Sequence, residues 1–227
     1  MKYEILLFDA DNTILDFDKS EAQALEHAFY DVGLEFSQTV LQVYRKNNIY
    51  QWQLFEKGKL TKAEVLVNRF VETFKELGLP LDKATETGDK YEEYLMFGFF
   101  IVPHAEEVLQ QLKNKRRLYV VSNGVAAIQN SRMKGSGMEK YFVARFVSED
   151  VGYPKPQKEY FDYCFNHIEN FDKSKTLIIG DSLSSDIQGG VNAGIDTCWF
   201  NPWKSINKSG LNPTYEITDL RQLLEIV

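Results

Sequence analysis

Two aspartates stand two residues apart directly after a short apolar run of the sequence. The run is Ile5–Phe8, and Asp9 and Asp11 follow it. In a β-strand, residues i and i+2 point to the same face. If the run is a strand of a parallel sheet, both carboxylates lie near its carboxyl end, where open α/β sheets bind ligands. A pair of acids at that position indicates chemistry rather than packing.

Polar clusters follow two later apolar runs, and a lysine lies in a nearby loop. The clusters are Ser122-Asn123-Gly124 and Gly180-Asp181-Ser182, and the lysine is Lys155. The strands of a parallel sheet end at one edge, so these clusters should converge with the pair of aspartates. The expected site therefore combines carboxylates, a hydroxyl and an amine.

The order of these residues resembles that of the haloacid-dehalogenase-like phosphohydrolase superfamily. The four motifs of that family occur here as Asp9-x-Asp11-x-Thr13, Ser122, Lys155 and Gly180-Asp181-Ser182-x-x-x-Asp186. The first motif alone arises by chance in roughly a few per cent of chains of this length, and the ordered set is far rarer. A helical insertion after the first motif is similar to the family's α-helical cap, so the resemblance covers essentially the whole chain.

Asp9 and Asp11 also suit phosphate ester hydrolysis on chemical grounds. Phosphate monoesters hydrolyse so slowly in water that enzymes must supply accelerations of up to ~10²¹-fold. A carboxylate with an ordinary pKa of ~3.9 is ionised at neutral pH, so Asp9 can attack phosphorus without a base and form an aspartyl-phosphate. Asp11 can protonate the leaving oxygen and then deprotonate the hydrolytic water.

The acids of the motifs predict a divalent cation. Up to four carboxylates beside a phosphate dianion would repel the substrate, and an all-oxygen ligand set favours Mg²⁺. The resemblance implies that Asp9 and Asp181 bind this ion through their side chains. It also implies that the backbone carbonyl of Asp11 binds the ion and that Asp186 contacts the ligands around the ion.

The resemblance assigns phosphate-binding groups as well. Lys155 would neutralise the nucleophile and the phosphoryl oxygens, and Ser122 would donate a hydrogen bond to one of them. In isolation Ser122 could be a helix N-cap, so its assignment depends on the combination of motifs. Further residues expected to bind the substrate are Thr13, Asn123 and Gly124.

Asp11 restricts the choice within the superfamily, because dehalogenases lack an acid there and transport ATPases carry threonine. Phosphatases and phosphomutases remain. Finer features resemble a bacterial branch that contains pyrimidine nucleoside 5′-monophosphate phosphatases. These features are Phe8-Asp-Ala-Asp11, Trp52 with Gly58, Gln129 and Arg132 after Ser122-Asn123-Gly124, and Asn192–Trp199. The resemblance thus implies a 5′-nucleotidase acting on substrates such as UMP, dUMP and dTMP, although His104 replaces a glycine common in the family.

Two other functions stay open. A sugar-phosphate phosphatase, or a phosphomutase similar to β-phosphoglucomutase, would share every core residue and differ only in cap contacts. A noncatalytic binding protein on the same scaffold is the remote alternative, and retention of the motif acids and Lys155 argues against it. The expected partner is a small phosphorylated metabolite, which in the favoured case is a nucleoside monophosphate.

Alternation of apolar runs with helical patterns predicts an α/β fold, with a doubly wound parallel sheet of the Rossmann-like kind. We expect residues 1–17 and 97–227 to form the catalytic core and residues 18–96 to form an inserted helical cap. Expected strands cover residues 2–11, 117–121, 144–147, 176–179 and 196–200. Expected helices cover residues 20–30, 39–56, 61–77, 82–96, 105–113, 126–134, 157–167, 186–193 and 220–226.

The composition of the chain indicates which partners it can bind and in which cellular compartment it is expected. With 26 Lys and Arg against 33 Asp and Glu, the net charge is −7, which argues against general binding to nucleic acids or anionic membranes. No apolar run approaches the ~18 residues of a membrane span, and the N-terminus lacks a secretory pattern, so we expect a soluble cytoplasmic protein. Cys164 and Cys198 lack metal-site spacing and should be buried and reduced.

We expect the polar and aromatic residues of the insertion to have structural rather than catalytic roles. Asn47, Asn48 and Arg69 are expected on the surface unless they face the cleft. The aromatic residues are expected in a bundle core, because helical periodicity explains most of them. They are Tyr44, Tyr50, Trp52, Phe55, Phe70 and Phe74.

Overall fold

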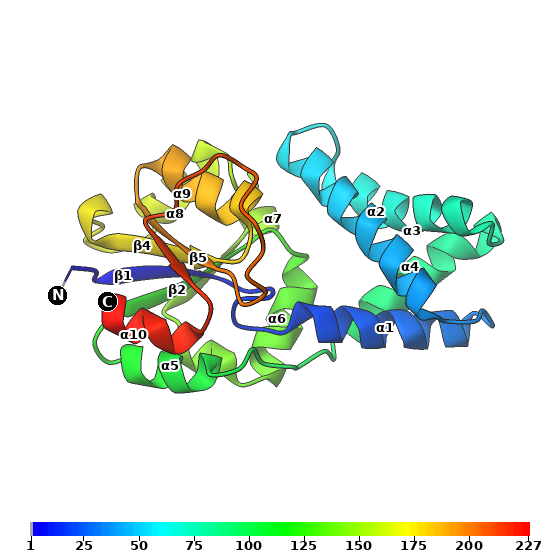
Figure 1. The fold of residues 1–227 in the computed structure, drawn as a ribbon, viewed down its shortest axis with the longest axis horizontal. Coiled ribbons are helices and arrows are strands. Elements are labelled where there is room, and N and C mark those ends of the chain that lie inside the picture. Colours follow the sequence, from blue (N-terminus) through cyan, green and yellow to red (C-terminus); the bar gives the residue numbers. More distant parts are fainter. Residues whose placement is uncertain (1) are drawn as a thin grey trace. The chain divides into compact units, whose positions relative to one another are not determined.

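The computed structural model describes residues 2–227, and the chain forms two compact units. The sheet unit comprises the chain up to Asp16 together with Phe99–Val227, and the helical unit comprises Phe17–Gly98. The helical unit is therefore an insertion into the sequence of the sheet unit. Figure 1 shows the strands in the first unit and the long helices in the second.

A six-stranded, wholly parallel sheet forms the centre of the sheet unit. Its order is β3-β2-β1-β4-β5-β6, so the order reverses between β1 and β4. The predicted doubly wound sheet is confirmed. The strands are β1 (Ile5–Asp9), β2 (Arg117–Ser122), β3 (Ala144–Val147), β4 (Thr176–Gly180), β5 (Asp196–Phe200) and β6 (Tyr215–Ile217). The edge strand β6 was not predicted, because only one of its three residues is buried.

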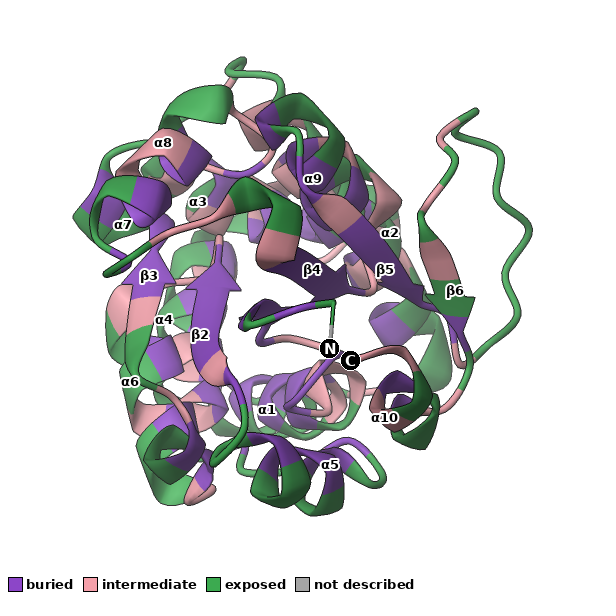
Figure 2. Cartoon of the chain, turned by 90° about the vertical axis from the view of Figure 1, so that its left-hand side faces the viewer, coloured by how far each residue is buried: buried purple, intermediate pink, exposed green. Residues whose placement is uncertain are grey.

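Helices cover both faces of the sheet. Leu6 and Phe8 pack in an apolar cluster with α5 (Ala105–Leu112), α6 (Ala126–Gly135) and α10 (Leu223–Ile226). The alternate residues Ile5 and Leu7 pack with α7 (Ser148–Val151), α8 (Lys158–Asn166) and α9 (Gln188–Ala193). Figure 2 shows β2, β4 and β5 as almost wholly buried. Burial on both faces explains why these strands are continuous apolar runs in the sequence.

The helical unit consists mainly of α1 (Phe17–Asp31), α2 (Gln38–Glu56), α3 (Lys62–Leu77) and α4 (Ala84–Leu95). Helix α1 packs on α4, and α2 packs on α3. Helix α3 begins at a capping box in which Thr61 and Glu64 exchange side-chain-to-backbone hydrogen bonds, and it ends at Gly78 in the left-handed conformation. Both signals were readable in the sequence.

The interior of the helical unit is more polar than predicted. The prediction of Asn47, Asn48 and Arg69 as surface residues is wrong, since all three are buried. Arg69 donates hydrogen bonds to Asn48 Oδ1 at 3.4 Å and to Glu92 Oε1 at 3.1 Å, and its guanidinium lies 5.0 Å from the centre of the Tyr91 ring. These contacts compensate a buried cation, which helical periodicity alone cannot reveal.

The aromatic prediction holds in part. Tyr44, Phe70 and Phe74 are buried, and the rings of Tyr44 and Phe70 lie 5.0 Å apart. Tyr50, in contrast, is 57% exposed.

Several short segments complete the fold. The helix predicted over residues 186–193 begins earlier, with a π-helical turn at Leu183–Ile187 that continues into α9. The predicted C-terminal helix is a 3₁₀ turn, Leu220–Gln222, followed by α10. Cys164 and Cys198 are buried and unpaired, as predicted. Within residues 2–227, no helix has the length and apolar character needed to cross a bilayer.

Candidate active site

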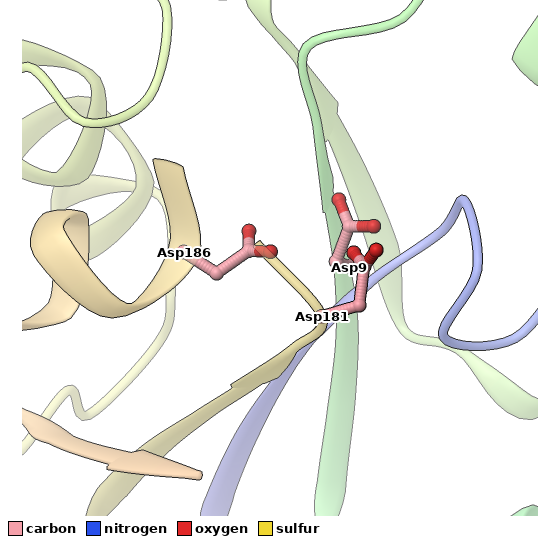
Figure 3. Close-up of side chains that lie close together, drawn as sticks. All are labelled: Asp9, Asp181 and Asp186. Carbon is pink, nitrogen blue, oxygen red and sulfur yellow. The ribbon is translucent and has the colours of Figure 1, made fainter. Parts of the chain in front are cut away.

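Three acids gather at the carboxyl edge of the sheet, where the strand order reverses. Asp9 is the last residue of β1, Asp181 directly follows β4, and Asp186 lies in the π-helical turn that comes next. One carboxylate oxygen from each lies within 4.8 Å of the others. Figure 3 shows Asp9 and Asp181 side by side near neighbouring strand ends, with Asp186 reaching in from the turn. The structure thus brings these three predicted residues together.

Asp186 reaches the cluster because Gly180 has no side chain. A Cβ atom at Gly180 would lie 2.2 Å from Asp186 Oδ2, and this oxygen accepts a hydrogen bond from the Ser182 N–H at 3.1 Å. The indole N–H of Trp199 donates to the Asp181 carbonyl at 2.8 Å. The Gly180-Asp181-Ser182 motif therefore shapes the loop that carries two of the acids.

Lys155 is buried beside the acids. Its Nζ donates to Asp9 Oδ1 and to Asp186 Oδ1, both at 2.6 Å, and to the Val121 carbonyl at 2.9 Å. These bonds use all three N–H groups of the ammonium. The predicted lysine therefore lies in the site, where it joins the first and the last of the acidic motifs.

Asn123 holds Lys155 through the backbone. Its Nδ2 donates to the Lys155 carbonyl at 2.9 Å, and its Oδ1 accepts from the Lys155 N–H at 2.8 Å. Ser122 is buried, and its Oγ accepts from the Gly124 N–H at 3.0 Å, which leaves the hydroxyl hydrogen for another acceptor. The substrate contacts expected of Asn123 and Gly124 stay predictions. The hydrogen bonds described here instead fix the positions of Lys155 and Ser122.

The loop after β1 turns tightly and buries Thr13. Asn12 has a φ of 56°, and the N–H groups of Ile14 and Leu15 both donate to the Ala10 carbonyl, at 3.0 and 2.9 Å. Among residues 2–227, the buried Thr13 hydroxyl has no hydrogen-bond partner. A buried hydroxyl without a partner is unfavourable, so this atom suits the substrate contact predicted for Thr13.

The carboxylate of Asp11 is held by helix α6. Its Oδ1 accepts from Arg132 Nη1, and its Oδ2 accepts from Gln129 Nε2. In the sequence, Gln129 and Arg132 mark a subgroup but carry no predicted role. Their spacing is the signal that could have revealed one, because residues i and i+3 share a helix face and this helix directly follows the Ser122-Asn123-Gly124 motif.

Burial and mutual repulsion perturb the titration of the acids. Burial raises the pKa of Asp9 to about 8; Lys155 opposes this increase, and Asp186 and Asp11 add to it. The pKa of Asp181 is raised well above its ordinary value, first by burial and then by Asp9 and Asp186. Burial lowers the pKa of Lys155, but Asp186 and Asp9 together raise it above its ordinary value.

The donor set fits a divalent cation. When all four motif acids are ionised, their charge exceeds that of the two nearby cations, Lys155 and Arg132, by two. Three carboxylates with oxygens within 4.8 Å of one another offer only hard oxygen donors, which Mg²⁺ and Ca²⁺ prefer. A cation there would stabilise the ionised form of acids whose pKa is otherwise raised.

The sequence matches known proteins along its whole length. Residues 6–200 match the family described as haloacid dehalogenase-like hydrolase. The chain is 37% identical over 226 residues to pyrimidine 5′-nucleotidase PynA of Streptococcus pneumoniae, which covers 99% of this chain and 95% of PynA. It is 30% identical over 227 residues to pyrimidine 5′-nucleotidase YjjG of Escherichia coli, which covers 100% of this chain and 99% of YjjG.

A solved structure has the same fold. The HAD-hydrolase YfnB of Bacillus subtilis, crystallised bound to magnesium, is 42% identical with a TM-score of 0.94 and covers 100% of this chain and 99% of YfnB. The chain therefore belongs to the haloacid dehalogenase-like hydrolase family.

Proposed function

We propose that this enzyme is a Mg²⁺-dependent phosphatase that hydrolyses pyrimidine nucleoside 5′-monophosphates such as UMP, dUMP and dTMP. The cluster of Asp9, Asp181 and Asp186 beside the Lys155 amine carries the proposal. Relatives named pyrimidine 5′-nucleotidases, at 37% and 30% identity over almost the whole chain, support the substrate class. The acidic cluster, together with YfnB crystallised with magnesium, supports the metal.

In the first step, the carboxylate of Asp9 attacks phosphorus. A bond forms between a carboxylate oxygen and phosphorus while the bond between phosphorus and the 5′-oxygen of the nucleoside breaks. Asp11 gives a proton to that departing oxygen. Lys155, fixed between Asp9 and Asp186, keeps the nucleophile in place and balances part of its charge.

In the second step, water hydrolyses the aspartyl-phosphate. Asp11 takes a proton from the water, whose oxygen bonds to phosphorus as the bond to Asp9 breaks. Orthophosphate leaves, and Asp9 is regenerated. Asp9 and Asp181, with Asp186 beside them, would hold Mg²⁺, which would supply positive charge to offset that of the acids and of the phosphate dianion. We assign Ser122 and Thr13 as hydrogen-bond donors to the substrate phosphate.

A panel of phosphate esters tests the substrate. Phosphate release is measured with Mg²⁺ and with UMP, dUMP, dTMP, AMP, glucose 6-phosphate and ribose 5-phosphate. We expect the highest kcat/KM for the pyrimidine nucleotides. A preference for sugar phosphates would contradict the nucleotide assignment, and absence of turnover with every ester would contradict the phosphatase itself.

The nucleophile is tested by Asp9→Asn. We expect no measurable turnover, because an amide cannot attack phosphorus as a carboxylate does, while circular dichroism shows an intact fold. The control is Asp82→Asn, which changes an exposed aspartate of the helical unit and should keep wild-type kcat. Normal phosphate release by Asp9→Asn would refute the covalent route.

A further inference from the structure

Helix α6 carries two polar residues that engage both oxygens of the Asp11 carboxylate. Arg132 Nη1 donates to Oδ1, and Gln129 Nε2 donates to Oδ2. The cluster that suits a metal is formed by other acids, Asp9 and its two neighbours, and does not include Asp11. Asp11 is thus held by a separate part of the sheet unit from the one that holds the nucleophile.

Burial distinguishes these two residues from ordinary partners of a surface acid. The Arg132 side chain is fully buried, whereas the Asp11 side chain is 28% exposed. Gln129 is 2% exposed. A buried guanidinium requires a charged or polar partner to replace its lost hydration, and it keeps one orientation because packing restricts it. Fixed donors inside the unit therefore set the direction of a partly exposed acid.

Gly124 gives Gln129 the room it needs. A Cβ atom at Gly124 would lie 2.5 Å from Gln129 Nε2, which is the atom that donates to Asp11. A side chain at this position would therefore displace the amide from Asp11. The glycine of the Ser122-Asn123-Gly124 motif has a steric role in this contact, in addition to any contact with substrate.

We propose that Arg132 and Gln129 are positioning residues, which hold the carboxyl group of Asp11 in the orientation needed for proton transfer to the leaving oxygen. The proposal rests on the phosphatase activity proposed above. An aspartate side chain without such partners samples several rotamers, and a well-placed general acid contributes about 10²- to 10⁴-fold to the rate. Loss of these contacts should slow only those substrates whose leaving group needs a proton.

Two substrates separate positioning from general damage. The nucleoside alkoxide of UMP requires a proton to leave, whereas the phenolate of p-nitrophenyl phosphate leaves without one. Because kcat/KM covers the steps up to departure of the leaving group, we expect Arg132→Met to lower it about 10²-fold for UMP and less than about fivefold for p-nitrophenyl phosphate. Arg132→Lys, which retains the charge, should recover part of the loss for UMP.

Two further variants and one control accompany this test. Gln129→Met and Gly124→Ala should show the same selectivity with a smaller loss, and they carry the test if Arg132→Met fails to fold by circular dichroism. The control is Arg116→Met, which removes another buried arginine of the sheet unit and should leave the ratio of the two kcat/KM values unchanged.

The outcomes distinguish this proposal from the proposed function. An equal fall for both substrates in folded variants, or an unchanged value for UMP, would overturn the positioning role. A wild-type enzyme that hydrolyses neither ester would instead contradict the proposed function.

Discussion

At the scale of single residues, the contacts around Lys155 are short and buried. Lys155 lies 2.6 Å from both Asp9 and Asp186, and its side chain is only 1% exposed. Solvent screens such a buried pair little, and removal of one partner typically destabilises a protein by ~3–5 kcal/mol, because the other charge is left uncompensated. The geometry of the site and the stability of the sheet unit therefore depend on the same side chains.

Gly180 offers a sharp test of this geometry. In Gly180→Ala, the new Cβ would lie 2.2 Å from Asp186 Oδ2, so Asp186 must move away from the cluster and from Lys155. A misplacement of about 1 Å can lower catalysis about 10²-fold, and we expect a fall of that order in kcat.

A second glycine provides the control for Gly180→Ala. Gly137 has a φ of +73°, and a Cβ atom there would have no neighbour within 4 Å, so Gly137→Ala strains the backbone without touching the site. It should lower the thermal unfolding temperature but keep kcat. Wild-type kcat in Gly180→Ala would show that the position of Asp186 does not matter for turnover.

At the scale of elements, the strand ends were predictable and the helix contacts were not. Asp9 and Asp181 lie close together because parallel strands end at one edge, and apolar runs reveal such strands in the sequence. The contact of Arg132 with Asp11 depends on how α6 is rotated against the sheet. That rotation is decided by packing of the whole apolar cluster, which no local pattern encodes.

The polar interior of the helical unit escaped prediction for a related reason. Amphipathic periodicity assigns polar residues to the solvent face, yet Glu21 is buried and accepts hydrogen bonds from Arg45 Nε at 2.6 Å and Asn48 Nδ2 at 3.3 Å. Partners from another helix make this burial possible. Arg45 and Asn48 of α2 come opposite Glu21 of α1 only when the unit folds.

Buried Glu21 should make the stability of the protein depend on pH. Burial raises its pKa from 4.5 to about 7, against the opposing effect of Arg45. The folded state therefore binds the carboxyl proton of Glu21 more tightly than the unfolded state does. The resulting contribution of Glu21 to the free energy of unfolding is complete below pH 4.5 and is lost as the pH rises to about 7. By linkage, at ~1.4 kcal/mol per pKa unit, the loss amounts to about 3 kcal/mol.

Urea unfolding at a series of pH values measures this contribution. Between pH 4.5 and about 7, the free energy of unfolding should decrease less in Glu21→Gln than in the wild type, because the variant has no carboxyl group to titrate at this position. Glu26→Gln, which changes an exposed glutamate of the same helix, should follow the wild type. Identical pH profiles for the wild type and Glu21→Gln would contradict a titrating Glu21.

At the scale of the whole molecule, the residues to which we assign the chemistry lie in one unit. The four motif acids, Lys155 and the α6 residues that hold Asp11 all belong to the sheet unit, and the helical unit is inserted between the first motif and the others. A ligand that binds the folded acids stabilises the unit that contains them. We therefore expect the metal to stabilise the two units unequally.

Removal and return of divalent cations tests this expectation. EDTA should abolish turnover and Mg²⁺ should restore it, because the acids otherwise repel the phosphate dianion. At about 100 times its Kd, Mg²⁺ should stabilise the sheet unit by about 2.7 kcal/mol, measured as slower amide hydrogen exchange in β1 and β4 with little change in α1 to α4. Asp181→Asn should lose this protection. Full activity in EDTA, or equal protection of both units in the wild type, would be incompatible with a cation bound at this cluster.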